Sequence, residues 1–183
     1  VLRGTAVNQD GATPNISQPR GSSQIDVAKA ALSRAGLAGR EIGYVEAHGT
    51  GTSVGDPIEA KSLGEVFGKE RLDGACVVGS VKTNFGHTES AAGVAGVIKA
   101  ALMVQRGKIP PNLHFEEPNP DIDFQELNLE VPTELQDWNQ SKVRRAAVNS
   151  FGFGGTNAHI IIEAPPSVGK TKTSGETSQV LSN

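Results

Sequence analysis

Two histidines, His48 and His87, stand in polar, glycine-containing loops, each shortly after an apolar run that reads as a β-strand. A third loop of this kind, residues 151–155, follows another apolar run. Histidine suits proton transfer and hydrogen-bond donation because either ring nitrogen can carry the proton near neutral pH. Ligands of α/β proteins bind at the carboxyl ends of the strands, where such loops meet. We therefore expect the three loops to converge on one pocket that contains both histidines.

The elements that position these loops alternate between strands and helices. Apolar runs predict strands over residues 2–7, 42–47, 76–81, 128–131, 146–150 and 158–163, the fourth of them at a sheet edge. Helical spacing predicts helices from Ser22 or Ser23 to about Ala35, from Asp56 to Phe67, and over residues 91–104. This alternation predicts an α/β protein with helices packed on a mostly parallel or mixed sheet.

Two of the predicted helices carry explicit end signals. Ser23 and Asp26 have the spacing of a capping box, and Gly36 suits the left-handed position that ends a helix. Asp56 is the expected N-cap of the second helix, and Gly68 should end it. These signals predict where both helices begin and end.

The helix predicted over residues 91–104 is almost wholly apolar and rich in Gly and Ala. A helix that is apolar all round lies in the interior of a protein, where small residues let its neighbours approach closely. We therefore expect this helix to need cover on every side, and the isolated chain to be prone to aggregation if that cover is missing.

The composition argues against several classes of protein. A formal charge of −3 and a pI near 5.8 leave no basic surface for nucleic acid. No run reaches the ~18 apolar residues that a membrane span needs, and no signal peptide is visible. One cysteine offers neither an internal disulfide nor a zinc cluster, so we expect no metal and a cytoplasmic protein. The start at Val1 suggests a segment of a longer protein.

Three segments carry the strongest functional signal: EAHGTGTSVGDPIEA at residues 46–60, GSVKTNFGHTESAAG at 79–93 and NSFGFGGTNAH at 149–159. In this order and at these separations they resemble the β-ketoacyl synthase (ketosynthase) family, in its modular, type I polyketide synthase branch. The stretch AVNQDG at residues 6–11 is similar to the segment just ahead of that family's second half. The resemblance covers roughly residues 1–165.

The resemblance implies a fold and a set of partners. The fold would be the C-terminal half of a thiolase-like layered α/β/α domain, built by residues 1–165 and followed by a flexible linker over residues 166–183. The intact family fold consists of two similar halves and forms dimers. The implied partners are therefore the N-terminal half of the ketosynthase domain, a second copy in a homodimer, and an acyl carrier protein.

The activity that the resemblance implies is acyl transfer by decarboxylative Claisen condensation. An acyl chain is held on cysteine as a thioester, a malonyl-type extender loses CO₂, and the resulting enolate attacks the acyl carbon. By motif match, His48 and His87 donate N–H groups to the enolate oxygen as its charge develops. No cofactor is expected to bind directly, because the phosphopantetheine arm of the carrier protein delivers the substrates.

Lys82 matches the lysine of the family's KTN segment, and Asn84 and Glu89 are assigned to structural support. Two interpretations of Lys82 stay open. Its ammonium would bias the electrostatic field of the pocket in a direct catalytic role, or it would form a structural ion pair with Glu89 that holds the loop. The sequence favours neither.

Phe153 and Gly154 correspond to the family's gating turn, where the backbone N–H of the phenylalanine belongs to the oxyanion hole for the acyl thioester. Glycines let such main-chain donors approach a ligand, although the turn taken alone would be a plain connection between two strands. By the same resemblance, Thr50 and Thr52 hydrogen-bond the phosphopantetheine arm. The remaining histidines, His114 and His159, match no motif and are expected to be structural.

The chain lacks the family's nucleophilic cysteine, which belongs to the first half of the domain. Cys76 lies in an apolar strand, where a thiol is a small buried hydrophobe rather than a nucleophile. We therefore expect an active parent enzyme and an inactive isolated fragment. The alternative is a non-catalytic partner that contributes shape, dimer contacts or chain-length control. Thiolase chemistry is disfavoured because it needs a second cysteine near the C-terminus, and none follows Cys76.

Overall fold

The computed structural model describes residues 1–15, 18–72, 74–138 and 143–166. Apart from Pro166, the linker predicted over residues 166–183 lies outside them. The strands are β1 (Leu2–Gln9), β2 (Tyr44–Glu46), β3 (Cys76–Gly79), β4 (Lys108–Ile109), β5 (Leu129–Glu130), β6 (Gln136–Asp137), β7 (Arg145–Phe151) and β8 (Thr156–Glu163). The helices are α1 (Gly21–Ala35), α2 (Gly55–Leu63), α3 (Lys82–Phe85) and α4 (Ala92–Arg106), with short turns of other helix types at Gly39–Glu41, Gly64–Gly68 and Glu89–Ala91.

The described strands form one mixed sheet in the order β1-β8-β7-β2-β3-β5, and β4 pairs separately with β6. Strand β2 runs parallel to both of its neighbours, β3 and β7, and β5 runs parallel to β3. Strands β1 and β8 are antiparallel to their partners. The carboxyl ends of β2, β3 and β7 therefore meet at one edge of the sheet, and β5 is the edge strand that the sequence predicted.

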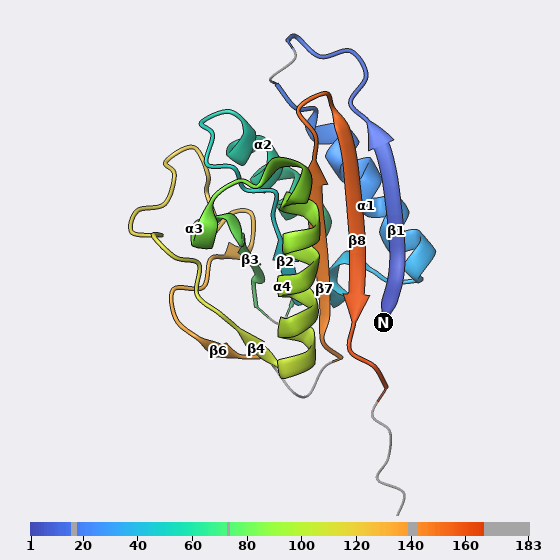
Figure 1. The fold of residues 1–183 in the computed structure, drawn as a ribbon, viewed down its shortest axis with the longest axis vertical. Coiled ribbons are helices and arrows are strands. Elements are labelled where there is room, and N and C mark those ends of the chain that lie inside the picture. The colour runs from blue at the N-terminus through green and yellow to red at the C-terminus, as the bar shows by residue number, and fades with distance from the viewer. Residues whose placement is uncertain (16–17, 73, 139–142, 167–183) are drawn as a thin grey trace, which may run out of the picture.

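Helices cover both faces of this sheet, as Figure 1 shows. Helices α1 and α2 pack on one face around buried Ala31, Val45 and Phe67. Helix α4 packs on the other face, around Met103 and Trp138 among others. The layered α/β architecture predicted from the sequence is confirmed.

The start of α1 differs from the prediction. The helix begins at Gly21 after Arg20, which has extended backbone angles and provides no side-chain cap. Ser23 lies inside the helix and is buried, so its hydroxyl does not form the predicted capping box with Asp26. The predicted C-terminus is confirmed, because Gly36 adopts the left-handed conformation with φ 65° and closes the last turn.

The start of α2 also differs. The helix begins at Gly55, one residue before the predicted N-cap Asp56, and the Thr52 hydroxyl accepts the Gly55 N–H at 3.0 Å. Asp56 instead accepts a hydrogen bond from Gly51 N–H at 3.1 Å. The helix continues as a π-helical turn and ends at Gly68, as predicted. A Cβ on Gly68 would lie 2.0 Å from the Leu127 carbonyl oxygen, so only glycine fits this approach.

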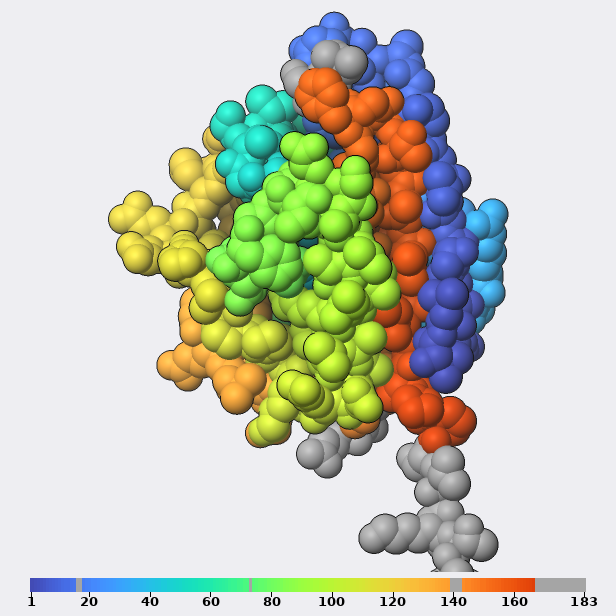
Figure 2. Space-filling view, viewed as in Figure 1, coloured from blue at the N-terminus to red at the C-terminus, as the bar shows by residue number. Residues whose placement is uncertain are grey.

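Helix α4 lacks, on one face, the cover that its apolar sequence is expected to need. Its inner face is buried, but Val94, Ile98 and Leu102 keep 56%, 56% and 40% of their surface exposed. These residues are four apart and therefore share one face of the helix. Figure 2 shows α4 lying open on this side of the molecule. We call these three residues the α4 stripe.

Two kinds of feature are missing from the described part of the chain. None of its helices is long and apolar enough to cross a membrane. Nor do three or more His, Cys, Asp or Glu side chains gather there in an arrangement that would hold a metal ion.

Candidate active site

The three predicted loops converge. They follow the carboxyl ends of the parallel strands β2, β3 and β7, and they line one cleft of about 780 Å³. The rings of His48, which is half-buried, and His87, which is exposed, both line it, with centroids 5.3 Å apart and planes at 85°. Residues 39 positions apart in the chain are thus brought edge to face by two neighbouring strands.

His48 is half-buried and has one ring nitrogen already engaged. The backbone N–H of Phe151 donates to His48 Nδ1 at 3.3 Å, and the two rings lie 5.5 Å apart. Because Nδ1 accepts, the proton of the neutral ring belongs on Nε2. Burial lowers the pKa of His48 to about 4, with further lowering by the positive charges of Lys82 and His87. The ring is therefore a neutral Nε2–H donor throughout the physiological range.

His87 has the same arrangement, built from local backbone. The N–H of Glu89 donates to His87 Nδ1 at 2.8 Å, which places the proton of the neutral ring on Nε2. Glu89 has φ 47°, a left-handed conformation that is uncommon for a non-glycine residue. Such conformations persist where the surrounding structure requires them, often at functional sites. Here the turn aims the Glu89 N–H at the ring.

A buried carboxylate in α2, Glu59, holds the His48 loop. Glu59 Oε1 accepts the backbone N–H of His48 at 2.8 Å, and Oε2 accepts that of Gly49 at 2.9 Å. Asn149 Nδ2 also donates to Oε1 at 2.8 Å. Burial raises the pKa of Glu59, and these three donors oppose that rise. An acidic residue at the start of a helix just after the histidine loop was the available signal.

Lys82 is half-buried near His48 and His87. It does not form the predicted ion pair, because no salt bridge joins Lys82 and Glu89, both of which the structure describes. Burial lowers the pKa of Lys82, and the negative charges of Glu59, Glu46 and Asp56 oppose that lowering. Glu89 supports the site through its backbone N–H instead. The ion-pair interpretation of Lys82 is therefore wrong in its partner, because the carboxylates that act on the ammonium come from β2 and α2.

The glycine-rich turn over residues 151–155 and the two threonines line the same cleft. Phe153 is 73% exposed at its rim, beside Gly154. Thr50 is exposed, and the Thr52 hydroxyl accepts from Gly55 while keeping its own proton for donation. Asn84 lies exposed on α3, where its N–H closes the turn onto the Val81 carbonyl at 3.0 Å.

The residues that the sequence analysis set aside lie away from the cleft. Cys76 is fully buried, and burial raises the pKa of its thiol to about 12, which suppresses the thiolate. His159 is fully buried, stacks on Phe67 at 5.8 Å and lies with Nδ1 2.6 Å from Asn149 Oδ1. His114 is exposed in the segment between β4 and β5.

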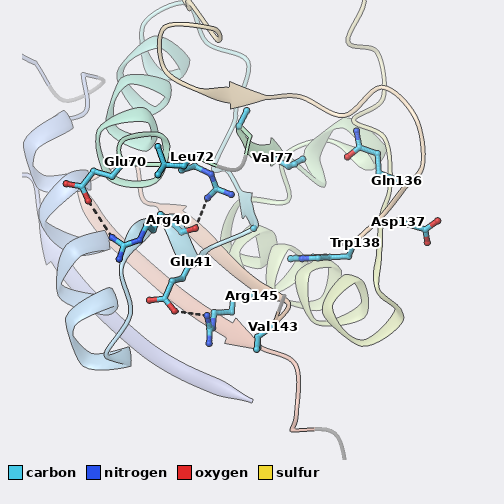
Figure 3. A pocket seen from close by; sticks show the side chains of 13 residues that line it. Arg40, Glu41, Glu70, Leu72, Val77, Gln136, Asp137, Trp138, Val143 and Arg145 are labelled. Atoms are coloured by element: carbon cyan, nitrogen blue, oxygen red, sulfur yellow. Dashed lines mark hydrogen bonds and ion pairs between the residues drawn. The ribbon is translucent and has the colours of Figure 1, made fainter. Parts of the chain in front are cut away.

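A second hollow lies at the amino ends of the same strands, near Gly43, Ala75 and Arg145 (Figure 3). Its charged side chains pair with one another or with main-chain oxygens. Arg145 lies 2.9 Å from Glu41 and Arg40 lies 3.6 Å from Glu70, while Arg71 donates to the Ile42 carbonyl at 2.6 Å. These contacts among the described residues hold the base of the sheet together.

Comparisons with known proteins agree with this geometry. The family described as beta-ketoacyl synthase, C-terminal domain, matches residues 1–116, and the ketoacyl-synthetase C-terminal extension matches residues 118–182. A highly reducing polyketide synthase of Preussia isomera is 52% identical over 164 residues, covering 89% of this chain and 7% of that protein. A phenolphthiocerol/phthiocerol polyketide synthase of Mycobacterium tuberculosis is 53% identical over 165 residues, covering 89% of this chain and 9% of its own length. The chain therefore spans less than a tenth of either relative.

Solved structures give the same picture. The ketosynthase from module 6 of the bacillaene synthase of Bacillus subtilis 168 superposes with a TM-score of 0.84 at 45% identity, over 90% of this chain and 30% of that one. Ketosynthase twelve of the bacillaene polyketide synthase of Bacillus amyloliquefaciens superposes with a TM-score of 0.85 at 39% identity, over the same shares of each chain.

Proposed function

The chain belongs to the β-ketoacyl synthase family, as a C-terminal ketosynthase segment of a type I polyketide synthase, and from that membership we propose that it supplies the two-histidine half of a condensing active site. The reaction is decarboxylative Claisen condensation, an acyl transfer between thioesters. Residues 1–165 are the half-domain, and residues 166–183 are the linker that follows it.

One observation carries this proposal. Two imidazoles lie 5.3 Å apart, and each has its Nδ1 turned toward a backbone N–H. The two Nε2–H groups are therefore free to donate into the same cleft. Fixed donors aimed at an oxygen that becomes negative in the transition state stabilise it at little reorganisation cost. An enolate oxygen is such a group.

Decarboxylation comes first in the proposed reaction. The bond between the malonyl carboxylate and Cα breaks, CO₂ leaves, and the electron pair remains as the thioester enolate. His48 and His87 donate to the enolate oxygen, and Lys82 adds positive charge nearby. The enolate carbon then attacks the acyl thioester on the partner half, and the cysteine thiolate leaves. The product is a β-ketoacyl thioester on the carrier protein.

The remaining cleft residues take supporting roles. Phe153 and Gly154 border the acyl site with the backbone of a glycine-rich turn. Thr50 and Thr52 present hydroxyls to the phosphopantetheine arm that delivers the extender from the acyl carrier protein. Glu59 and Glu89 position the histidine loops, and Asn84 belongs to the turn between Lys82 and His87.

The α4 stripe supports the proposal that a second half completes the domain. Val94, Ile98 and Leu102 are apolar and exposed side by side, and an exposed stripe of this kind marks a protein contact or an aggregation site. The chain covers only 30% of the length of a matching ketosynthase structure, so most of that domain lies outside it. The complementary N-terminal half is the occupant we propose, within a homodimeric parent.

Reconstitution tests the function. We expect the chain alone to release no CO₂ from malonyl carrier protein. Addition of a complementary half that carries the cysteine should produce both CO₂ and a β-ketoacyl product, measured by radiolabel release and mass spectrometry. A well-formed complex that accepts acyl groups on its cysteine but never decarboxylates malonyl thioester would overturn the proposal and favour the non-catalytic scaffold.

Polar substitution of the α4 stripe tests the proposed contact. We expect the unmodified chain to self-associate in size-exclusion chromatography with light scattering, because the stripe lacks cover. The triple variant Val94→Thr/Ile98→Gln/Leu102→Gln should be monomeric but bind the complementary half at least about 100-fold more weakly, since each lost buried aliphatic contact costs roughly 1–3 kcal/mol.

Leu135→Gln is the matched control, because Leu135 is 63% exposed and lies off α4. This variant should behave as the unmodified chain does in both measurements. A monodisperse, cooperatively melting monomer of the unmodified chain would count against an uncovered stripe.

A further inference from the structure

A second buried carboxylate joins the two histidine loops from beneath. Glu46, the last residue of β2, is 1% exposed. One of its oxygens accepts the backbone N–H of Val81, and the other accepts the Tyr44 hydroxyl at 2.7 Å. The ammonium of Lys99, which reaches over from α4, lies 2.8 Å from that second oxygen and also donates to the Tyr44 hydroxyl at 2.8 Å. Nothing in the proposed function uses this cluster.

The Glu46 carboxylate lies where it can link the two histidine loops. Glu46 precedes His48 by two residues, and Val81 directly precedes Lys82 and the loop to His87. The Glu46 to Val81 bond thus fastens the start of one histidine loop to the start of the other. A backbone bond from Ala47 N–H to the Gly79 carbonyl at 2.8 Å runs beside it.

The surroundings leave this carboxylate little freedom. A Cβ on Gly79 would lie 2.8 Å from the Tyr44 hydroxyl, and a Cβ on Gly96 would lie 3.1 Å from Glu46 Cγ. Both glycines are therefore in close contact with the cluster. A buried carboxylate that loses its counter-ion is costly, and it either takes up a proton or draws in another cation. Lys82, whose ammonium already interacts with Glu46, is such a cation.

We propose that Lys99 and Glu46 are positioning residues that set the separation of His48 and His87 and keep Lys82 beside them. This inference rests on the proposed function. Lys99 neutralises Glu46, Glu46 holds Val81, and Val81 fixes the entry to the His87 loop. Helix α4, whose outer face is open to solvent, thereby supports the two histidine loops through Lys99.

The test is a set of variants in the reconstituted ketosynthase. Lys99→Met should lower the decarboxylation rate roughly 10- to 100-fold, the scale expected when catalytic groups move by about 1 Å. Acylation of the cysteine on the complementary half, in which the proposed function gives the two histidines no role, should change less than about twofold. The matched control is Lys29→Met, the same change at an exposed lysine of α1, which should alter neither rate.

The double variant Glu46→Gln/Lys99→Met tests whether the loss in Lys99→Met comes from the Glu46 carboxylate left without its counter-ion. The glutamine oxygen can still accept from Val81 N–H, and no unpaired carboxylate remains. We expect it to recover at least about tenfold of the rate that Lys99→Met loses. Equal loss in the single and double variants would overturn the positioning role, and so would equal falls in decarboxylation and acylation.

A spectroscopic readout keeps the inference separate from the proposed function. In the ¹⁵N-histidine-labelled chain, Lys99→Met should shift the ring nitrogen resonances of His48 and His87, whereas Lys29→Met should not. If the reconstituted enzyme never decarboxylates but these shifts occur, the function fails and the positioning stands. Unchanged ring resonances in a folded Lys99→Met chain would overturn the positioning.

Discussion

Replacing His87 with alanine in the reconstituted ketosynthase is expected to slow malonyl-thioester decarboxylation by about 10²–10³-fold, the cost of removing one oxyanion-hole donor. The change deletes one of the two Nε2–H groups whose rings lie 5.3 Å apart. His48→Ala should cost at least as much, because it also removes the acceptor of the Phe151 N–H. The measurement is CO₂ release under single-turnover conditions, which reports the chemical step rather than product release.

The control for both substitutions is His114→Ala, which removes an exposed histidine outside the cleft and should leave the rate unchanged. Acylation of the partner's cysteine should persist in all three variants. If His87→Ala decarboxylates at the unmodified rate, or if acylation falls with decarboxylation, the two histidines do not stabilise the enolate oxygen as proposed.

The histidine loops could be predicted from the sequence because their signals are local. Each histidine follows an apolar strand within a glycine-containing loop, and parallel strands bring such loops together. The layered fold could be predicted for the same reason, since alternation of strands and helices is a local pattern. The left-handed turn at Gly36 and the end, at Gly68, of the π-helical turn that continues α2 could be predicted for the same reason.

The carboxylates beneath the site could not be predicted in this way. Glu59 binds the N–H groups of His48 and Gly49 from the next helix, and Glu46 binds Val81 from a neighbouring strand. Their roles depend on which backbone N–H groups the tertiary structure leaves without a backbone acceptor. Residue spacing in the sequence does not predict this. The Lys82–Glu89 pair failed for the same reason, because charged residues close in sequence need not face each other once the turn at Glu89 points its backbone inward.

The stability of the chain should fall in mild acid because of His159. This ring is fully buried, and burial lowers its pKa from the usual 6.5 to about 4. Between pH 6.5 and 4 the unfolded chain therefore binds a proton that the folded chain excludes. Stability that is complete above pH 6.5 is lost as the pH falls through this window. From pH 7 to pH 5 the free energy of unfolding should drop by about 2 kcal/mol through this residue alone.

Urea unfolding measures this loss, with fluorescence from Trp138, the chain's single tryptophan, which is buried. Other groups contribute as well: burial also lowers the pKa of His48 to about 4, which adds a loss of the same sign, while the pKa of Glu59 is raised and that of Glu163 is lowered, so these two carboxylates have opposite signs. His159→Gln removes only the histidine term, and a glutamine amide can still donate to Asn149. The fall in the free energy of unfolding from pH 7 to pH 5 is compared between the two proteins. The difference between the two falls isolates the contribution of His159, even if the substitution lowers stability at pH 7.

The ring whose protonation destabilises the chain in acid is linked to the active site by a short series of contacts. His159 lies 2.6 Å from Asn149, Asn149 donates to Glu59, and Glu59 holds the backbone of His48. His159 Nε2 has no hydrogen-bond partner among the described residues, so protonating it would place an unsolvated charge at the base of this series of contacts while Nδ1 still donates to Asn149. We therefore expect the free energy of unfolding to fall more steeply from pH 7 to pH 5 in the unmodified chain than in His159→Gln. Equal falls in the two proteins would show that burial of His159 does not control the pH response.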